Sequence, residues 1–456
     1  MHGLGTALVL PVADLQDAAR AEPDDLETRF AGRMDDHLAA HSTAPVLVAL
    51  SGGSDSRALM FLAHRWAQLN GRPLIALTID HGLQPGSAEW ANDCARLCAR
   101  LGRHHQTLPW TGPKPATGLP AAARLARHRL LADQARALGG QVILMGHTAD
   151  DLDEAVAMRR AGSTVSSPRP WSPSPVWPEG RDIFILRPLL QVRRAALRNW
   201  LNLRDEPWIE DPANQDVRYA RARARKALGA SDTVTPQAEM SGPHAYPGAS
   251  AAPLPAGTRL EQDAGILVLR PALKRQQLAA ACLCAGGTSQ PPRTRQLDSI
   301  LERMARGQAF VATLAGARLE MQGSVLKVMR EAGEHRRGTA QPLDLPQNET
   351  VIWDGRFEMT ASTGNMTVLP LAGHVGKLPP TQQNQLKALP AAARPGLPLI
   401  RDDQGQFSCP ILAIGHPVSV RSLALARFRA ATGQIRHEAD MLTVAKHGKA
   451  TDDDLC

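Results

Sequence analysis

The stretch VLVALSGGSDSRALMFL, residues 46–62, carries the clearest structural signal in the chain. Its first five residues are apolar and rich in valine and leucine, which predicts a buried strand. Downstream, Leu59, Leu62, Trp66 and Leu69 recur at helical spacing and predict an amphipathic helix over residues 55–69. A segment of glycines and serines joins the two. The stretch therefore predicts a strand, a tight turn and a helix in immediate succession.

The joining segment has the chemistry of a phosphate-binding turn. It consists of Ser51, Gly52, Gly53, Ser54, Asp55 and Ser56. Glycines let the backbone turn tightly and approach a ligand, and the amides at a helix start attract an anion such as pyrophosphate. The serine hydroxyls add hydrogen bonds, while Asp55 either caps the helix or faces a magnesium ion. A serine-capped helix after a glycine turn is the alternative, which six specified residues in this context disfavour.

Further runs extend this pattern into an alternating fold. The runs LIALTI (74–79) and VILM (142–145) are typical of strands, and residues 87–101 and 119–138 are typical of helices. Strands that alternate with helices predict an α/β fold with a parallel, doubly wound sheet. In such sheets ligands bind outside the carboxyl ends of the strands. The motifs that directly follow the strands therefore form the candidate site.

These motifs resemble those of a known family. SGGSDS resembles the PP-loop of the ATP pyrophosphatases, which split ATP between the α and β phosphates, and it differs from the GxxxxGK(S/T) loop of other NTPases. DHGL (80–83) resembles the DHGLR element of tRNA(Ile)-lysidine synthases, with Gln84 in place of arginine. GHTADDLDE (146–154) is similar to their GHxxDDQxET motif, with Leu152 and Ala155 as departures. The resemblance to the tRNA(Ile)-lysidine synthase family is strong from about residue 45 to 228.

The resemblance implies an ATP site and catalytic groups. ATP binding falls to residues 51–56 and to Asp80, His81, Gly146 and His147. The helix AAARLARHRLL (121–131) resembles the ARxxRY pattern, with Arg124, Arg127 and His128 on one face. Arg124 is implied to stabilise charge on the α-phosphate, and a solvated arginine face is the alternative.

Two acidic residues complete the implied catalytic set. Asp151 and Glu154 are three residues apart and share a helix face, which suits the binding of Mg²⁺ or of a substrate ammonium group. Acidic residues also favour helix N-termini through the helix dipole, which is the alternative for single members of the run. The sequence does not decide which metal ligands, if any, the protein supplies.

The segment after this motif departs most from the family. Where the family shows RGSG and a GLxGM loop, this chain has RAGST (160–164) and then SSPRPWSPSPVWPEG (166–180). Trp171 and Trp177 are expected either to stack on an unpaired anticodon base or to pin the proline-rich loop to the core.

A basic segment follows. The chain has a net charge of +8, and residues 181–226 hold eleven Lys/Arg against six Asp/Glu, an excess of five. Such clustering suits the phosphate backbone of a nucleic acid, and a solvated arginine-rich face is the alternative. Arginine at every second position near residue 221 predicts an extended or helix-entry segment that touches several phosphates. The implied tRNA-binding residues are Arg127, Arg218, Arg221, Arg223 and Arg225.

With 456 residues, the chain is expected to form several domains. The predicted parts are a helical extension (1–44), the PP-loop catalytic domain (45–228), a Ser/Pro/Ala/Gly-rich linker (229–258), an α+β middle domain (259–340) with a helix at 294–306, and a β-rich C-terminal domain with a tail (341–456). The six scattered cysteines form no CxxC pair and favour a reducing compartment. No apolar run approaches the length of a membrane span, so we expect a cytoplasmic protein.

The resemblance implies an activity. The C2 oxygen of the wobble cytidine in the isoleucine tRNA with a CAU anticodon attacks the α-phosphate of ATP, pyrophosphate leaves, and the ε-amine of L-lysine then displaces AMP. ATP, Mg²⁺, this tRNA and free lysine are the implied cofactors and partners, and no stable protein partner is implied. The alternatives are a PP-loop tRNA thiolase, an amidotransferase for a small molecule, and a non-catalytic tRNA-binding protein on a decayed ligase scaffold. The segments after the linker are expected to grip the body of the tRNA.

Overall fold

The computed structural model describes residues 23–163, 165–211, 220–229, 259–261, 264–333 and 341–441. The chain divides into two compact units. The first unit comprises Met1–Pro115, Ala135–Trp171 and Ile185–Thr235, and the second unit comprises Ala116–Gln134, Ser172–Phe184 and Pro236–Cys456. The division therefore runs through the predicted catalytic domain, because two of its segments cluster with the C-terminal half.

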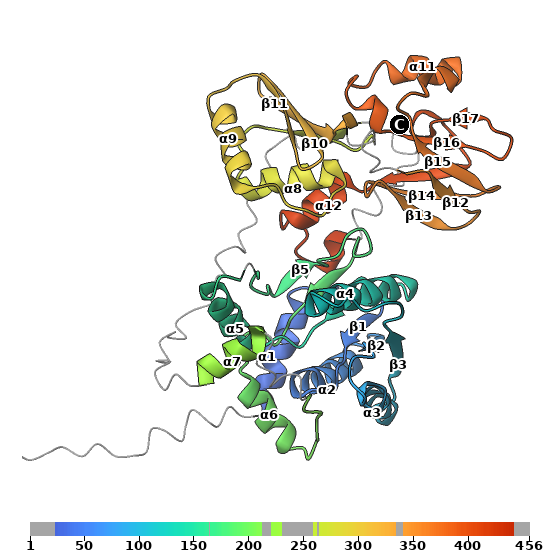
Figure 1. Cartoon of the computed structure of the whole chain (residues 1–456). Helices are drawn as coiled ribbons and strands as arrows, with labels where there is room; N and C mark the ends of the chain where they lie inside the picture. The colour runs from blue at the N-terminus through green and yellow to red at the C-terminus, as the bar shows by residue number, and fades with distance from the viewer. Residues whose placement is uncertain are drawn as a thin grey trace, which may run out of the picture. The chain divides into compact units, whose positions relative to one another are not determined.

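The first unit is built on a sheet whose strands β3, β2, β1 and β4 pair in parallel, and the β5–β6 hairpin extends this sheet (Figure 1). The strands of this sheet are β1 (Val46–Ala49), β2 (Leu74–Asp80), β3 (His104–Pro109), β4 (Val142–Leu144), β5 (Trp171–Pro173) and β6 (Phe184–Leu186). Their order is β3-β2-β1-β4-β6-β5. Val46 pairs in parallel with Leu74 of β2 on one side and with Val142 of β4 on the other. The predicted α/β class with a parallel, doubly wound sheet is confirmed.

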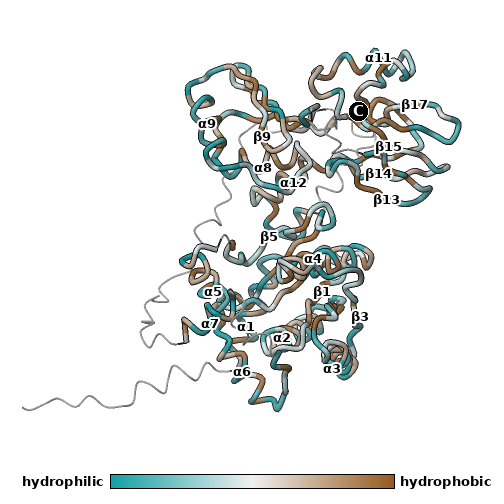
Figure 2. Tube along the Cα trace, in the orientation of Figure 1, coloured by the Kyte–Doolittle hydropathy of each residue, from teal (hydrophilic) through white to brown (hydrophobic). Residues whose placement is uncertain are grey.

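Helices connect these strands in the expected rhythm. They are α1 (Pro23–Asp35), α2 (Ser54–Leu69), α3 (Ser87–Arg100), α4 (Leu119–Ala137), α5 (Ala149–Arg160), α6 (Arg194–Asn202) and α7 (Ala220–Gly229). Leu59, Leu62 and Trp66 of α2 are buried, as their helical spacing predicts, while Leu69 is exposed. Val46, Leu47 and Val48 are fully buried, and Figure 2 shows β1 as a hydrophobic segment. Burial of this apolar stretch gives the first unit its core.

The strand order places the candidate motifs at a reversal of the sheet. From β1 the chain proceeds to β2 and β3 on one side, and it later returns to β4 on the other side. Loops that leave adjacent strands in opposite directions open a crevice at this point, where ligands of doubly wound sheets bind. The segments that follow β1 and β4 at this point are Ser51–Ser56, which includes the first turn of α2, and the loop Gly146–Thr148.

The second unit contains antiparallel sheets. One has the order β7-β8-β11-β10-β9, another β12-β15-β16-β17, and a third β13-β14-β18. Their bounds are β7 (Arg259–Glu261), β8 (Ile266–Leu269), β9 (Phe310–Leu314), β10 (Ala317–Gln322), β11 (Val325–Arg330), β12 (Leu343–Leu345), β13 (Thr350–Trp353), β14 (Phe357–Ala361), β15 (Met366–Pro370), β16 (Pro398–Arg401), β17 (Phe407–Ser408) and β18 (Val418–Ser422). The helices are α8 (Arg275–Gly286), α9 (Thr294–Ala305), α11 (Pro380–Leu386) and α12 (Ala424–Ala431), and the short 3-10 turns are η3 (Val375–Lys377), η4 (Arg394–Gly396) and η5 (Pro410–Leu412).

The boundary expected near residue 340 does not separate two cores. Ala424 and Phe428 of α12 are buried in the same apolar cluster as Leu278 of α8. A second cluster joins Ile266 of β8 to Leu399 of β16. The segments on either side of residue 340 therefore share their hydrophobic interiors. The predicted linker, residues 229–258, lies outside the described residues except for Gly229, and the extension contains α1 within its described part.

A buried ion triad lies where these segments meet. Asp354 accepts hydrogen bonds from Arg330 at 2.8 Å and from Arg356 at 2.9 Å, and all three side chains are at most 3% exposed. The guanidiniums are further satisfied by backbone carbonyls, at Gly286 and at Gly396. A buried charge is stable only with such partners.

Among the described residues, no helix is long and apolar enough to cross a membrane.

Candidate active site

The turn after β1 is preformed by its own side chains. Gly52 has a φ of +84°, which an L-residue with a Cβ adopts only under strain. The hydroxyl of Ser56 donates to the carbonyl of Gly53 at 3.0 Å and accepts from the amide of Ser51 at 3.1 Å. These bonds close the turn over the start of α2. The turn thus presents a helix N-terminus of the kind that binds phosphate.

A second segment supports this turn from behind. The amide of Ile209 donates to the carbonyl of Gly52 at 3.0 Å, and a Cβ on Gly52 would lie 2.4 Å from the Cδ1 atom of Ile209. Next to Ile209, Glu210 accepts from Arg198 and from the indole of Trp208, both at 2.8 Å. The WIED segment (208–211) therefore fixes the shape of the turn, a role that its sequence alone does not reveal.

The loop after β4 packs directly against the same turn. A Cβ on Gly146 would lie 3.0 Å from the carbonyl carbon and oxygen of Asp55 and 3.1 Å from the amide nitrogen of Ser56. Only glycine lets the two backbones approach so closely. His147 follows, and its Nδ1 atom accepts from the buried Arg187 at 3.1 Å. The structure thus brings two of the predicted ATP-binding motifs together.

The third ATP-binding motif follows β2. Asp80 accepts a hydrogen bond from the amide of Gly82 at 2.9 Å, which shapes the turn there. The ring of His81 lies edge-on to Trp110, with 5.9 Å between the ring centroids. The loop therefore ends at the same edge of the sheet as the turn after β1. The role of Asp80 and His81 in nucleotide binding stays a prediction.

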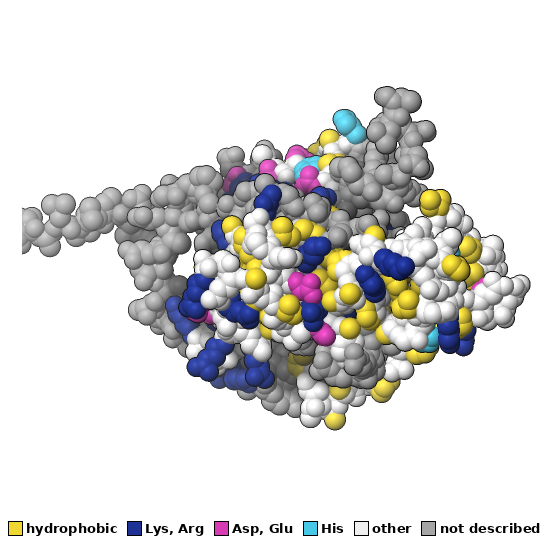
Figure 3. Space-filling view, turned by 90° about the horizontal axis from the view of Figure 1, so that it is seen from above, with side chains coloured by type: hydrophobic (Ala, Val, Ile, Leu, Met, Phe, Trp, Pro, Cys, Tyr) yellow, Lys and Arg dark blue, Asp and Glu magenta, His cyan; other side chains and the backbone are white. Residues whose placement is uncertain are grey.

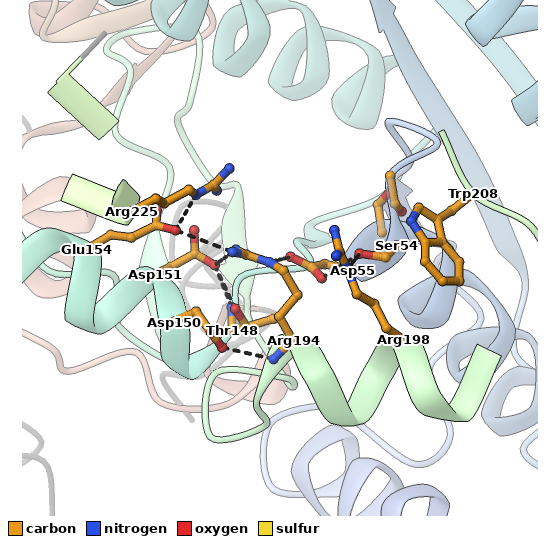
Figure 4. A network of polar contacts seen from close by, with 12 residues as sticks. Ser54, Asp55, Thr148, Asp150, Asp151, Glu154, Arg194, Arg198, Trp208 and Arg225 are labelled. Atoms are coloured by element: carbon orange, nitrogen blue, oxygen red, sulfur yellow. Dashed lines mark hydrogen bonds and ion pairs between the residues drawn. The ribbon is translucent and has the colours of Figure 1, made fainter. Parts of the chain in front are cut away.

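An arginine that the sequence did not single out lies at the centre of the site (Figure 4). Arg194, at the start of α6, donates from Nε to Asp55 at 2.8 Å. Its other nitrogens lie 3.4 Å from Glu154 and 3.7 Å from Asp151. The backbone amide of Arg194 also donates to Asp150 at 2.8 Å. Arg194 therefore ties the phosphate turn to the acidic helix α5.

The two predicted catalytic carboxylates share these arginine partners. Asp151 is 5% exposed and Glu154 is 1% exposed. Arg221 donates to Asp151 and to Glu154, both at 2.7 Å, and Arg225 donates to Glu154 at 2.5 Å. Asp151 also caps α5, because its Oδ2 atom accepts from the amide of Thr148 at 2.8 Å. The prediction that Asp151 and Glu154 lie on one helix face is confirmed.

The helix α7 changes the interpretation of the basic segment. From Ala220 the chain is helical, so the extended conformation that the sequence allowed is wrong for residues 220–229. Arg221 and Arg225, four residues apart, share the helix face that meets Glu154. In this structure Arg221 and Arg225 are thus paired with the carboxylates of the site. Contact with tRNA phosphates stays a prediction for these two residues and for Arg223. Arg218 lies outside the described residues.

Burial shapes the acidity of the phosphate turn. Loss of solvent raises the pKa of Asp55 above its ordinary value of 3.8, although the charge and the hydrogen bond of Arg194 act in the opposite direction. The effect of desolvation on the pKa of Asp55 is thus larger than the opposite effect of the Arg194 guanidinium. The partner of the Asp55 carboxylate is Arg194. Asp55 does not cap α2, because the N-cap residue is Gly53.

The described carboxylates of the site lie beside a guanidinium. Among the described residues, no group of three or more His, Cys, Asp or Glu side chains lies close enough to hold a metal ion. Asp55, Asp151 and Glu154 are instead each within 4 Å of Arg194. A magnesium ion that accompanies ATP takes oxygen ligands from phosphates and water as well as from carboxylates. The described donor set therefore gives no support for a protein-held Mg²⁺.

The arginine helix predicted at 119–138 belongs to the second unit over most of its length. Residues up to Gln134 of α4 cluster there. Arg124 is exposed and Arg127 is partly buried, whereas His128 is only 2% exposed. His128 therefore points toward the interior and does not extend an exposed arginine face. The roles of Arg124 at the α-phosphate and of Arg127 at tRNA stay predictions.

The tryptophans and cysteines of the first half have structural roles. Trp171 stacks on His37 at 5.0 Å between centroids, and the indole of Trp177 donates to the carbonyl of Gly355 at 2.9 Å. Both rings thus pin the proline-rich loop, one of the two roles expected. Cys94 and Cys98 are buried on α3, and burial beside Cys94 raises the pKa of Cys98 to about 12. Both cysteines are therefore small buried groups of α3.

Comparison with known proteins agrees with this geometry. A family model described as a PP-loop domain matches residues 26–231. The tRNA(Ile)-lysidine synthase of Caulobacter vibrioides is 44% identical over 412 residues, which cover 89% of this chain and 97% of the relative. The tRNA(Ile)-lysidine synthase of Mesorhizobium japonicum is 37% identical, over 77% of this chain and 79% of the relative.

Solved structures give a weaker similarity. The U34-tRNA thiolase NcsA from Methanococcus maripaludis has a TM-score of 0.38 and 15% sequence identity, and the match covers 45% of this chain and 73% of that one. The family is shown by the sequence relatives, which this chain matches over nearly the full length of the Caulobacter protein. The chain, with its PP-loop turn beside an acidic helix, belongs to the tRNA(Ile)-lysidine synthase family.

Proposed function

We propose that this protein is a ligase that joins L-lysine to C2 of the wobble cytidine in the isoleucine tRNA with a CAU anticodon, at the expense of ATP. The observation that supports this best is the contact between the phosphate turn and the acidic helix, which Arg194 makes through Asp55 on one side and Glu154 on the other. A nucleotide held at the turn would thus lie beside carboxylates suited to an incoming amine.

In the first step the tRNA base is adenylated. The amides at the start of α2 and the hydroxyls of the turn bind the pyrophosphate part of ATP. Attack of the cytidine oxygen on the α-phosphate builds negative charge there, and Arg124 is proposed to stabilise it. Pyrophosphate leaves, and the base carries AMP.

In the second step the ε-amine of lysine displaces AMP. An ammonium group is drawn to Asp151 and Glu154, which are buried and already bind guanidiniums. Lysine that enters here takes the place of Arg221 or Arg225 at Glu154, because the buried carboxylate has few free positions. The exchange keeps the carboxylates compensated, so neither state leaves a buried charge unpaired.

The body of the tRNA is proposed to bind the second unit. Figure 3 shows Lys and Arg side chains gathered toward one end of the face it presents. Exposed basic residues on and beside α8 and α9 are Arg270, Lys274, Arg275, Arg293, Arg295 and Arg306. Phosphates of a nucleic acid backbone are attracted by such a cluster. Replacement of Arg293 and Arg295 by alanine should weaken tRNA binding and lower its salt slope by about one per lost phosphate contact.

The exposed Arg401, on β16 of the same unit, serves as the control for this surface. Arg401→Ala should leave both tRNA affinity and salt slope unchanged. Equal binding by the wild type and the double alanine variant would remove α9 from the tRNA contact.

The rival functions make different predictions. Thiolation needs a reactive or cluster-binding cysteine, yet Cys94 and Cys98 are buried, and burial raises the pKa of both thiols. A small-molecule amidotransferase does not explain the basic segment. A decayed scaffold that only binds RNA would show thermal stabilisation by tRNA and none by ATP.

The decisive experiment is incubation with ATP, labelled lysine and CAU-anticodon tRNA. Label should enter the tRNA, with AMP and pyrophosphate released. Arg124→Ala and Asp151→Ala should each abolish incorporation while the protein stays folded. Asp153→Ala is the matched control and should stay active, because it removes an exposed carboxylate of the same helix that pairs with the exposed Arg193. Near-normal incorporation by either of the first two variants would overturn these roles.

A further inference from the structure

The chain between the acidic helix and Arg194 forms a hairpin that enters the second unit. We call this segment, with strands β5 and β6, the 171–186 hairpin. Its tip, Ser172–Phe184, belongs to the second unit, whereas Trp171 and Ile185 on either side belong to the first. The chain therefore leaves α5, joins the second unit and returns before it supplies Arg194 to the site.

The tip of the hairpin is held by charged side chains of the C-terminal sheet. Arg181 donates to Glu358 on β14, and Arg421 on β18 donates to Asp182 at 2.6 Å. Arg421 also donates to Glu358 at 3.1 Å, from the same nitrogen. The side chains of Arg181 and Glu358 are only 10% and 22% exposed. An ion pair with so little solvent is screened weakly by salt. The Arg421–Asp182 pair is more exposed, at 32% and 37%, and adds a second link between the tip and the sheet.

Further contacts reinforce the tip. The indole of Trp177 donates to Gly355, and the guanidinium of Arg427 on α12 lies 4.0 Å from the centre of its ring. A guanidinium over an indole at this distance is an attractive cation–π pair. Glu179 pairs with Arg129 of α4 at 2.8 Å, so the helix that carries Arg124 is bound to the same tip. Four elements of the second unit, β14, β18, α12 and α4, thus contact the hairpin.

The base of the hairpin is held just as firmly at the active site. The amide of Arg187 donates to Pro170 at 2.7 Å, which closes the two arms on each other. The side chain of Arg187 donates to the backbone carbonyl of Arg169 at 2.7 Å and to the Nδ1 atom of His147 at 3.1 Å. His147 lies in the loop that backs onto the phosphate turn. The base therefore sets the position of the loop that opens α5.

We propose that the ion pairs between the 171–186 hairpin and the C-terminal sheet limit the motion of the loop and helix that form the nucleotide site. Glu358 and Arg421 are then positioning residues for lysine transfer. This inference rests on the proposed function. With the ion pairs broken, the tip moves more freely, and its arms carry that motion to Arg187 and His147. Catalytic groups must be held within a fraction of an ångström, so greater motion at α5 slows the reaction without removing any group that touches substrate.

The test uses the full-length protein and the double variant Glu358→Gln/Arg421→Gln, which keeps side-chain volume and removes both charges. Arg318→Gln is the matched control, because it breaks an ion pair of 2.7 Å with Glu320 in the same unit and lies outside the proposed tRNA surface. Arg421→Lys is the conservative variant, since one ammonium nitrogen can serve the two carboxylates that a single nitrogen of Arg421 now serves. Each protein is assayed for single-turnover lysine transfer, ATP-induced thermal shift and hydrogen exchange.

The double variant should transfer lysine about tenfold more slowly, in keeping with a small misplacement of catalytic groups. Amides of residues 146–160 should exchange faster, the ATP-induced shift should persist, and Arg421→Lys and Arg318→Gln should match the wild type. Equal rates and equal exchange in the double variant would overturn the inference. A rate loss that only follows the fraction of unfolded protein would overturn it too. If the wild type itself transfers no lysine, the proposed function fails, while the exchange experiment still decides the link.

Discussion

Replacement of Gly52 by alanine tests the shape of the phosphate turn. Two costs arise. The φ of +84° is unfavourable for alanine by roughly 1–2 kcal/mol. The new Cβ would also lie 2.4 Å from the Cδ1 atom of Ile209, an overpacking that costs typically about 1–3 kcal/mol more. The expected loss of unfolding free energy is the sum, about 2–5 kcal/mol.

A matched variant separates the two costs. Gly71 has a φ of +60° and nothing within 4 Å of the position that a Cβ would take, so Gly71→Ala carries only the backbone strain. Thermal unfolding of both variants, with and without ATP, gives the measurement. Gly71→Ala should keep the ATP-induced shift, which at a hundredfold excess over Kd corresponds to about 2.7 kcal/mol, whereas Gly52→Ala should lose it.

A second substitution checks the cause. Ile209→Val removes the Cδ1 atom that the new methyl group would strike, so it should restore the overpacking part of the loss in the Gly52→Ala background and leave the backbone strain. The reasoning is refuted if Gly52→Ala unfolds like Gly71→Ala and still responds to ATP. It is also refuted if Ile209→Val brings no recovery.

Asp354→Ala should cost about 3–5 kcal/mol of unfolding free energy, because it leaves two buried guanidiniums without their carboxylate, and the exposed Asp344→Ala should cost little in the same denaturation experiment. Burial raises the folded-state pKa of Asp55, so wild-type stability relative to Asp55→Asn should fall as the pH rises from 3.8 through that raised value; a difference that grows with pH contradicts this. Burial acts to raise the pKa of Glu358, but the Arg421 and Arg181 guanidiniums outweigh burial and hold this pKa below 4.5. The stability that Glu358 adds relative to Glu358→Gln should therefore be complete above pH 4.5 and should disappear as the pH falls through the lowered pKa. Thermal unfolding of both proteins at a series of pH values measures this difference.

Apolar periodicity predicted the strands and helices that bury hydrophobic residues. The runs at 46–50, 74–79 and 142–145 became β1, β2 and β4 with ends shifted by a residue or so, and the helix predicted over 294–306 also formed, as α9. The strand β3, HHQTLP, was missed because it lies at the edge of the sheet and has no apolar run. Strand β5 was missed because it is only three residues long and lies in a proline-rich segment.

For the site, too, local sequence signals were found and contacts between distant segments were not. The glycine turn and the acidic pair are local signals, so the sequence found them. Arg194 lies in a run with Arg193 and Arg198, and only the fold distinguishes it, by bringing Asp55 to it across 139 positions. Ile209 carries no chemical group that marks a site, yet it determines the shape of the turn. Such residues become visible only when the elements are in place.

The shared core of the second unit has a consequence for synthesis on the ribosome. Phe428, near the end of the described chain, fills the same interior as Leu278 and Ile300. While α12 is still to be made, α8 and α9 lack part of their apolar covering, and a nascent chain in that condition exposes surface that favours aggregation. A segment translated late, α12, therefore closes the interior of a region translated much earlier, and a premature stop codon before residue 424 should leave a product that proteases remove.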